Sequence, residues 1–320
     1  MSDLTSIEKV LITGGSGMVG KSILNHSEIH KWKIFAPTRN ELNLNDYLTI
    51  EKLIKKFKPD LIIHSAGHCG GIHTSISEPV DFLVNNIEIG KNIILAAKNL
   101  NIKRFLNLAS SCMYPRNAKS PLSENLILKG ELEPTNEGYA LAKIFTTKLC
   151  QYINRERSDL KYKTLIPCNL YGPNDKFDPQ RSHAIASIIH KIHNAKKNHE
   201  KKISIWGNGL ARREFMYVSD LADFIIECMK RFDEVPEIIN SGLGKDYSIN
   251  DYYKIIAKEL SWKGEFTHDL SKPVGMKQKM VCTKLLDKFG WKHKTSLEKG
   301  IKLTVEFYNN MINKNGKILR

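Results

Sequence analysis

Short apolar runs alternate with longer amphipathic segments through the first half of the chain. The short runs predict buried strands, and the longer segments, with apolar residues three and four positions apart, predict helices that cover a sheet. Such alternation is typical of βαβ units, so we expect an α/β fold with a doubly wound parallel sheet. The expected strands are 10–13, 32–36, 61–64, 104–108 and 164–166, and the expected helices are 19–24, 47–57, 80–100 and 139–157.

The pattern becomes less regular after Gly172-Pro173 and predicts a smaller α+β lobe. No low-complexity linker separates the two halves. We therefore expect residues 1–172, with return segments near 213–242, to form a Rossmann-type domain, and residues 173–320 to form mainly a second lobe, with a cleft between the two. The expected elements of the second half are a strand at 203–206 and helices at 183–195, 219–231, 249–260 and 297–311.

The composition is that of a soluble globular protein, with 41% hydrophobic and 26% charged residues in 320 and a mean hydropathy of −0.34. No run predicts a signal peptide or a membrane span, so we expect a cytoplasmic protein without a membrane partner. The net charge of +15 is typical of some nucleic-acid-binding proteins, but the basic runs, including the tail 314–320, lie in no binding-module pattern. We therefore expect no nucleic-acid partner.

The six cysteines lack C-x-x-C spacing, which predicts reduced thiols and no metal site.

A glycine-rich segment, residues 13–20, follows the first expected strand and opens the first helix. Gly14 would permit a tight turn, Gly17 would let a pyrophosphate approach the backbone, and Gly20 would let helix and sheet pack closely. Glycines also make simple turns, but this position between strand and helix predicts a dinucleotide cofactor. The expected cofactor-binding residues of the segment are Gly14, Gly17, Met18, Val19 and Gly20.

The end of the second expected strand discriminates between NAD and NADP, because the adenosine ribose lies there in this fold. An acidic residue would bind the ribose of NAD, whereas this chain has Pro37-Thr38-Arg39. A guanidinium is suited to the 2′-phosphate of NADP, so Arg39 favours NADPH. The alternative is an ordinary surface arginine.

Tyr139 and Lys143 are four residues apart on an expected helix, so their side chains share one face. A nearby ammonium favours the phenolate of a tyrosine, whose ordinary pKa is about 10, and makes its hydroxyl usable for proton transfer. Ser110 stands at the end of the fourth expected strand, where its hydroxyl would lie beside the tyrosine. With the glycine-rich segment, these residues predict a nicotinamide-dependent oxidoreductase.

Several segments carry a resemblance to a known family: Gly70–Ile72, Ser110–Pro115, Leu132–Glu137, Tyr139–Lys143, Asn169–Pro173, Ser182-His183, Ile205–Gly209, Arg213–Phe215 and Phe289–Trp291. Over nearly its whole length the chain resembles the GDP-L-fucose synthase family of the extended short-chain dehydrogenase/reductase superfamily. The resemblance implies that NADPH reduces the 4-keto group of a GDP-4-keto-6-deoxy sugar. Ser110 and Tyr139 would hold and protonate the 4-oxygen, and Lys143 would tune the tyrosine and hold the nicotinamide ribose. Asn86 is a further expected cofactor contact.

The resemblance also implies epimerisation at C3 and C5 of the sugar before reduction. The protons on these carbons are acidic because the carbanion delocalises into the carbonyl, so the reaction needs a base, an acid and an oxyanion stabiliser. By position Cys112 would be the base and His183 the acid. The alternatives are an apolar loop residue for Cys112 and a neighbour of a helix N-terminus for His183.

Four residues would bind the GDP-sugar by the same resemblance. Asn169 would approach the diphosphate, and Lys191 and Arg213 would bind phosphate. Trp206 would stack on the base or the sugar. The alternatives are a structural ion pair for Arg213 and ordinary burial for Trp206.

Departures from the family pattern surround the cofactor and sugar sites. Ser16 stands where a basic residue is usual, and His68-Cys69 replace a Lys-Val pair. Val274 and Gln278 replace an acidic and a basic residue. These changes leave a second substrate open, a GDP-4-keto-6-deoxy-heptose reduced at C4 without epimerisation.

Alternatives from other classes also stay open. A non-catalytic Rossmann-type binding protein would share the fold but would not need an activated tyrosine. A nucleotide-sugar 4-epimerase or dehydratase would recycle bound NAD instead of consuming NADPH. By resemblance, the expected helices 80–100 and 139–157 pair with those of a second copy in a homodimer.

Overall fold

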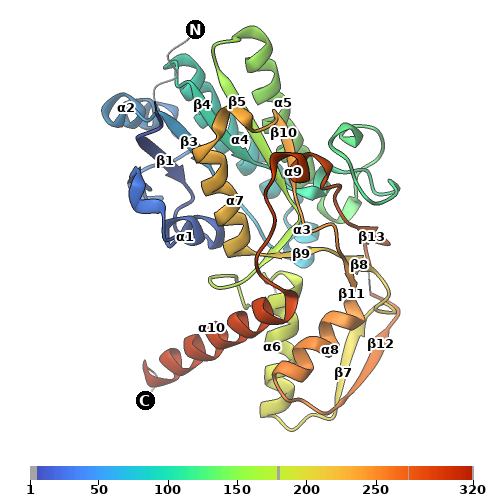
Figure 1. Ribbon diagram of the computed structural model, residues 1–320. Helices are drawn as coiled ribbons and strands as arrows, with labels where there is room; N and C mark the ends of the chain where they lie inside the picture. Colours follow the sequence, from blue (N-terminus) through green and yellow to red (C-terminus); the bar gives the residue numbers. More distant parts are fainter. Residues whose placement is uncertain (1–5, 179–180, 273, 319–320) are drawn as a thin grey trace.

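A six-stranded parallel sheet forms the centre of the protein, in the order β2-β1-β3-β4-β5-β10. The computed structural model describes residues 6–178, 181–272 and 274–318 (Figure 1). Residues 319–320, the end of the basic tail, lie outside the described residues. The strands are β1 (Lys9–Thr13), β2 (Lys33–Phe35), β3 (Leu61–His64), β4 (Arg104–Leu108), β5 (Lys161–Pro167) and β10 (Ile238–Ser241).

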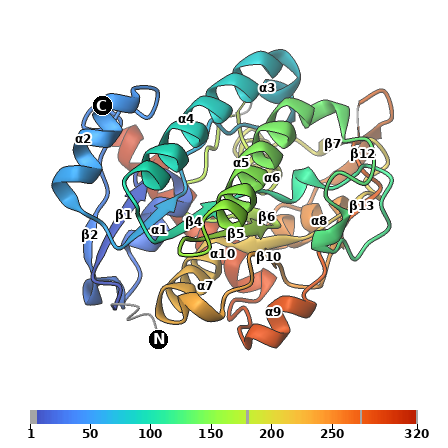
Figure 2. The same ribbon diagram turned by 90° about the horizontal axis from the view of Figure 1, so that it is seen from above.

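Helices cover both faces of this sheet, as the view in Figure 2 shows. The predicted doubly wound sheet is confirmed. Its central strands are buried on both faces and therefore consist of continuous apolar runs, such as those of β1, β3 and β4. The helices that begin and end near the expected positions are α1 (Met18–Leu24) and α7 (Val218–Lys230) on one face, and α2 (Tyr47–Phe57), α4 (Pro79–Asn99) and α5 (Glu137–Glu156) on the other.

The second lobe consists of short strand pairs and three longer helices. Its separate apolar core is built around Ile189, Tyr252 and Ile301. The helices are α6 (Ala184–Lys197), α8 (Ile249–Glu259) and α10 (Leu297–Ile318). The strand pairings are β6 (Asn169–Tyr171) with β9 (Phe215–Tyr217), β7 (Lys202–Trp206) with β12 (Glu265–Asp269), and β8 (Arg212–Arg213) with both β11 (Tyr247–Ser248) and β13 (Gln278–Lys279).

The chain crosses between the lobes more than once. The strand β10, for which the apolar pattern predicted no strand, returns to the central sheet and pairs with β5. The short helix α9 (Lys284–Phe289) and Trp291 also pack against the core beneath that sheet. A second short helix, α3 (Ile72–Ser77), follows β3. The first lobe therefore includes segments from late in the sequence.

Candidate active site

The glycine-rich turn lies at the point where the sheet order reverses, between β1 and β3. Ligands of doubly wound folds bind at this point, outside the carboxyl ends of the strands. Gly14 has a φ of +78°, and a Cβ there would lie 2.6 Å from the backbone N of Ala66. A Cβ on Gly20 would lie 2.2 Å from the carbonyl oxygen of Gly14. Gly17 precedes α1 and is exposed, so the turn offers an open helix N-terminus of the kind that holds a pyrophosphate.

Arg39 is exposed in the loop after β2. The loop is held by Glu41, whose carboxylate accepts hydrogen bonds from the backbone N–H and the hydroxyl of Thr38, both at 2.8 Å. These two bonds lower the pKa of Glu41. The loop therefore presents the exposed guanidinium of Arg39 where the 2′-phosphate is expected. The carboxylate of Glu41 is hydrogen-bonded to Thr38.

Helix α5 and the end of β4 bring the predicted catalytic residues together. The Nζ of Lys143 donates a hydrogen bond to the carbonyl oxygen of Leu108 at 2.9 Å and lies 5.6 Å from the centre of the Tyr139 ring. Ser110 follows β4, and its hydroxyl accepts a bond from the backbone N–H of Cys112 at 3.4 Å. This bond caps a one-turn helix, Ser111–Met113, that packs against α5.

Burial sets the proton states of this group. It raises the pKa of Tyr139 well above the ordinary value, and the neighbouring thiols of Cys69 and Cys112 act in the same direction. Burial also lowers the pKa of Lys143. Tyr139 is thus a protonated phenol in the free protein, which is the form that a proton donor requires.

Cys69 is a site residue that the sequence did not single out as functional. Its Sγ lies 3.5 Å from the hydroxyl oxygen of Tyr139. The loop that carries Cys69 is held by Asn86, whose amide accepts from the N–H of His68 at 2.8 Å and donates to the carbonyl oxygens of His68 and Phe82 at 3.1 and 2.7 Å. Asn86, a predicted cofactor contact, thus holds the backbone of this loop through its amide.

Cys112 is buried in the one-turn helix after β4. Burial raises the pKa of its thiol and sets the net direction, although the charge of Lys279, the Ser110 hydrogen bond and the charge of Lys143 offset part of this rise. Lys279 lies on β13 and was also missed, although the neighbouring Gln278 stood out as a departure from the family pattern. Its cation favours the thiolate that a carbon-acid base requires.

His183 directly precedes α6 and faces Asp175. Its Nδ1 lies 2.9 Å from the Oδ1 of Asp175, a carboxylate whose side chain is only 3% exposed. Burial alone would lower the pKa of His183, but the hydrogen bond and the charge of Asp175 outweigh it, so the net pKa is raised. The raised pKa favours the imidazolium that a general acid requires, and nothing in the sequence linked Asp175 to it.

Two of the expected phosphate-binding cations are held by backbone carbonyls. The Nζ of Lys191 donates to the carbonyl oxygen of Ser204. Arg213 donates to the carbonyl oxygens of Met276 and Val274 at 2.6 and 3.0 Å. The structural ion pair, the alternative considered for Arg213, is made among the described residues by the preceding Arg212, with Asp246 at 2.7 Å.

Asn169 and Trp206 lie at the ends of short strands in the second lobe. The amide of Asn169 donates to the carbonyl oxygen of Glu214 at 2.9 Å. Trp206 is half-buried at the end of β7, with its ring edge-on to that of His73 at 4.7 Å between centres. His73 belongs to α3, so Trp206 lies where the two lobes meet.

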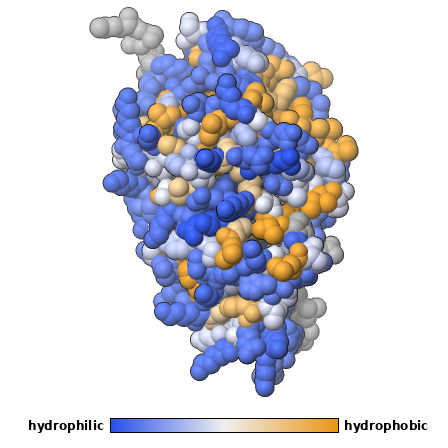
Figure 3. All heavy atoms as spheres, turned by 90° about the vertical axis from the view of Figure 1, so that its right-hand side faces the viewer, coloured by the Kyte–Doolittle hydropathy of each residue, from blue (hydrophilic) through white to orange (hydrophobic). Residues whose placement is uncertain are grey.

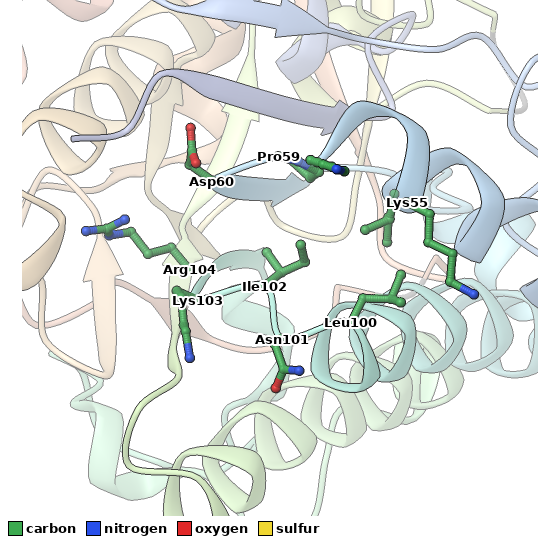
Figure 4. Close-up of a pocket in the computed structure, with 10 residues that line it drawn as sticks. Lys55, Pro59, Asp60, Leu100, Asn101, Ile102, Lys103 and Arg104 are labelled. Atoms are coloured by element: carbon green, nitrogen blue, oxygen red, sulfur yellow. The ribbon is translucent and has the colours of Figure 1, made fainter. Parts of the chain in front are cut away.

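A cavity of about 540 Å³ lies at the opposite edge of the sheet (Figure 4). Its lining comes from the end of α2 and from the segments that enter β3 and β4. The carboxylate of Asp60 accepts bonds from the N–H groups of Glu8 and Lys9, and Lys103 is paired with Asp159 at 2.6 Å. These polar groups hold the strand ends together, and the cavity is remote from the catalytic set.

The residue ranges that the structure describes contain no cluster of three or more histidine, cysteine or acidic side chains able to hold a metal ion. None of their helices combines the length and apolar character needed to cross a membrane.

The doubly wound sheet, the glycine-rich turn at its switch point and the serine–tyrosine–lysine set define an extended short-chain dehydrogenase/reductase. The family model described as NAD dependent epimerase/dehydratase family matches residues 10–242. GDP-L-colitose synthase from Yersinia pseudotuberculosis is 52% identical over 302 residues, which cover 94% of this chain and 98% of that protein. GDP-L-fucose synthase from Azorhizobium caulinodans is 44% identical over 301 residues, covering 94% and 96%. The chain belongs to the NAD dependent epimerase/dehydratase family and, within it, to the GDP-L-fucose synthase family, as the sequence motifs predicted.

Solved structures agree with this assignment. A GDP-6-OMe-4-keto-L-xylo-heptose reductase from C. jejuni is 28% identical with a TM-score of 0.87, covering 96% of this chain and 99% of that one. The GDP-mannoheptose C4 reductase MlghC from Campylobacter jejuni, solved with NADP bound, is 28% identical with a TM-score of 0.84, covering 95% and 99%.

Proposed function

We propose that this protein reduces the 4-keto group of a GDP-linked 4-keto-6-deoxy sugar with NADPH, after epimerising the ring. The observation that carries the proposal is the half-buried, protonated Tyr139, with Lys143 on the same helix and Ser110 at the adjacent strand end. NADPH supplies the hydride that reaches C4. Tyr139 gives its proton to the 4-oxygen, and Ser110 donates a hydrogen bond to that oxygen as charge develops on it.

The cofactor site supports NADPH through its shape and charge. The open turn at Gly14 and Gly17 takes the pyrophosphate on the N-terminus of α1. Arg39 binds the 2′-phosphate, and Lys143 holds the nicotinamide ribose beside Tyr139. MlghC, with NADP bound in its structure, supports the same cofactor here.

Cys112 and His183 are the base and the acid of the epimerisation. Cys112 removes the proton next to the ketone as a thiolate, a form that the charge of Lys279 favours. His183 returns a proton from the imidazolium that Asp175 stabilises. A binding protein without catalysis would need neither the activated tyrosine nor this second proton-transfer pair.

The nucleotide is GDP in every relative and structure named above, which supports a GDP-sugar here. We assign its binding to Asn169, Lys191, Trp206 and Arg213; for Lys191 and Arg213 this requires a phosphate oxygen to replace a backbone carbonyl.

Colitose is fucose without the 3-hydroxyl, so the sugar is a 4-keto-6-deoxymannose or its 3-deoxy counterpart. Reduction of a heptose at C4 without epimerisation is the second candidate, supported by the two reductases of GDP-heptoses.

The test is to supply each GDP-sugar with NADPH in deuterium oxide and to determine the product by NMR. We expect stoichiometric NADPH consumption with a hexose substrate and deuterium at each inverted carbon. Consumption with the heptose alone, without deuterium on the ring, would establish the second candidate instead. Binding of NADPH without turnover of any of the sugars would contradict both.

We also propose a cytoplasmic homodimer that forms through α4 and α5, which lie side by side in Figure 2. Their outer surface exposes apolar side chains, each between 37% and 69% exposed: Val80, Val84, Leu141, Phe145 and Tyr152. Hydrophobic residues gather toward this side of the molecule at the upper right of Figure 3. Apolar patches of this kind mark association surfaces. Sedimentation should give a dimer that Phe145→Glu dissociates, and a monomeric parent protein would contradict the proposal.

A further inference from the structure

The thiol of Cys69 occupies a position that the proposed mechanism does not use. It is the hydrogen-bond partner of the Tyr139 hydroxyl, at 3.5 Å, and it stands where the family pattern has a valine that could not make this bond. Resting on the proposed function, we propose that Cys69 is a positioning residue of the reduction, which orients the Tyr139 hydroxyl for transfer of its proton to the 4-oxygen.

The backbone around Cys69 is held from two sides, so the thiol has a defined place. On one side the amide of Asn86 binds both the N–H and the carbonyl oxygen of the preceding residue, His68. On the other side the Nζ of Lys176 donates to the carbonyl oxygen of Cys69 itself at 2.8 Å. Because the loop is fixed on both sides of Cys69, this side chain loses little conformational freedom when the substrate binds.

The same loop is also fixed against the segment that carries the epimerisation acid. The N–H of Gly71 donates to the carbonyl oxygen of Arg181 at 3.2 Å, and a Cβ on Gly71 would lie 2.3 Å from the carbonyl oxygen of Ser182, next to His183. Cys69 is therefore held by the first lobe and by the second-lobe loop at once.

The chemistry of the step explains what the thiol contributes. Hydride adds to C4, the O–H bond of Tyr139 breaks, and its proton forms the new hydroxyl at C4, which leaves a phenolate on the tyrosine. The hydrogen bond between the Cys69 thiol and the Tyr139 hydroxyl fixes the direction of that hydroxyl before the proton is transferred. The phenolate then recovers its proton from solvent, and no further reactant is needed.

A matched pair of variants separates this role from packing. Cys69→Ser keeps a donor of nearly the same shape, whereas Cys69→Ala removes it. We expect Cys69→Ala to lower kcat for 4-keto reduction about tenfold, the scale of losing one hydrogen bond, and Cys69→Ser to stay within about threefold of the parent. The KM for the sugar and the dissociation constant of NADPH, measured by its fluorescence, should not change, because the thiol acts on Tyr139 alone.

A double-mutant cycle with Tyr139→Phe provides the decisive comparison. If the thiol acts through the tyrosine hydroxyl, Cys69→Ala has no further effect on the residual rate once that hydroxyl is gone. Equal losses in the alanine and serine variants, or additive losses in the cycle, would overturn the inference. A parent protein that consumes no NADPH with any GDP-4-keto sugar would instead overturn the proposed function itself, so the two failures are distinguishable.

Discussion

The His183–Asp175 pair makes a prediction about pH that can be worked from its geometry. The perturbation is Asp175→Asn, which removes the charge but preserves the shape of the side chain. The second carboxylate oxygen of Asp175 is buried without a hydrogen-bond partner among the described residues, so neutralising the group does not break another bond. We therefore expect the variant to fold and to keep its reductase site.

The size of the effect follows from the contact. A charge-assisted bond of 2.9 Å to a buried carboxylate contributes about 1.5–3 kcal/mol, but the His183 side chain is 36% exposed, and solvent screening reduces the benefit to about 1 kcal/mol. Loss of this contribution in Asp175→Asn therefore lowers the proton affinity of His183 about fivefold. Asp175 raises the pKa of His183, so the imidazolium persists to higher pH in the parent. An activity that needs this acid falls as pH rises through that pKa, and in Asp175→Asn it falls at lower pH.

The assay is the rate of deuterium incorporation at the carbons next to the ketone, followed by NMR between about pH 6 and pH 9. Asp178→Asn is the matched control, because it removes a charge from the same loop without being among the groups that shift the pKa of His183. The alkaline limb of the profile of incorporation rate against pH should move to lower pH in Asp175→Asn and stay in place in Asp178→Asn. A limb that does not move, or moves to higher pH, would refute the assignment of His183 as the charged acid.

Three other substitutions test the remaining roles. Tyr139→Phe should lower turnover about 10²- to 10⁴-fold with unchanged NADPH binding, and full activity would rule out Tyr139 as the donor. Arg39→Ala should lower kcat/KM for NADPH about tenfold and leave that for NADH unchanged, whereas equal losses would remove Arg39 from the 2′-phosphate. Cys112→Ser should abolish deuterium incorporation at C3 and C5 but retain slow direct reduction in stopped-flow measurements, because a hydroxyl is far less acidic than a thiol. Undiminished incorporation would assign the base elsewhere.

The strands of the central sheet could be predicted where burial on both faces demands continuous apolar residues. The strand β3 matches its predicted bounds, and β4 does as well. The strand β10 was missed because Asn240 and Ser241 are polar although fully buried. The amide of Asn240 accepts a bond from the hydroxyl of Tyr114 at 2.6 Å and donates to the carbonyl oxygens of Leu122 and Cys282, and no local pattern reveals partners that are 42 to 126 residues away.

The same limit applies to the active site. Tyr139 and Lys143 could be predicted because one turn of helix fixes their relation. Cys69 could not, since its contact with Tyr139 joins residues 70 positions apart through the packing of a loop. For Lys191 and Arg213 the sequence predicted a role whose contacts the free protein does not make. Each matches a phosphate-binding position of the family, but each donates to backbone carbonyls in the free protein.

The central claim is that hydride passes from NADPH to C4 of the sugar with Tyr139 as the proton donor. It is tested most directly with NADPH deuterated at the transferred position of its C4, incubated with GDP-4-keto-6-deoxymannose or its 3-deoxy counterpart. The account predicts one NADP formed per sugar and deuterium on C4 of the product, with both formed about 10²- to 10⁴-fold more slowly in Tyr139→Phe. A product formed without deuterium at C4, or without consumption of NADPH, would contradict it.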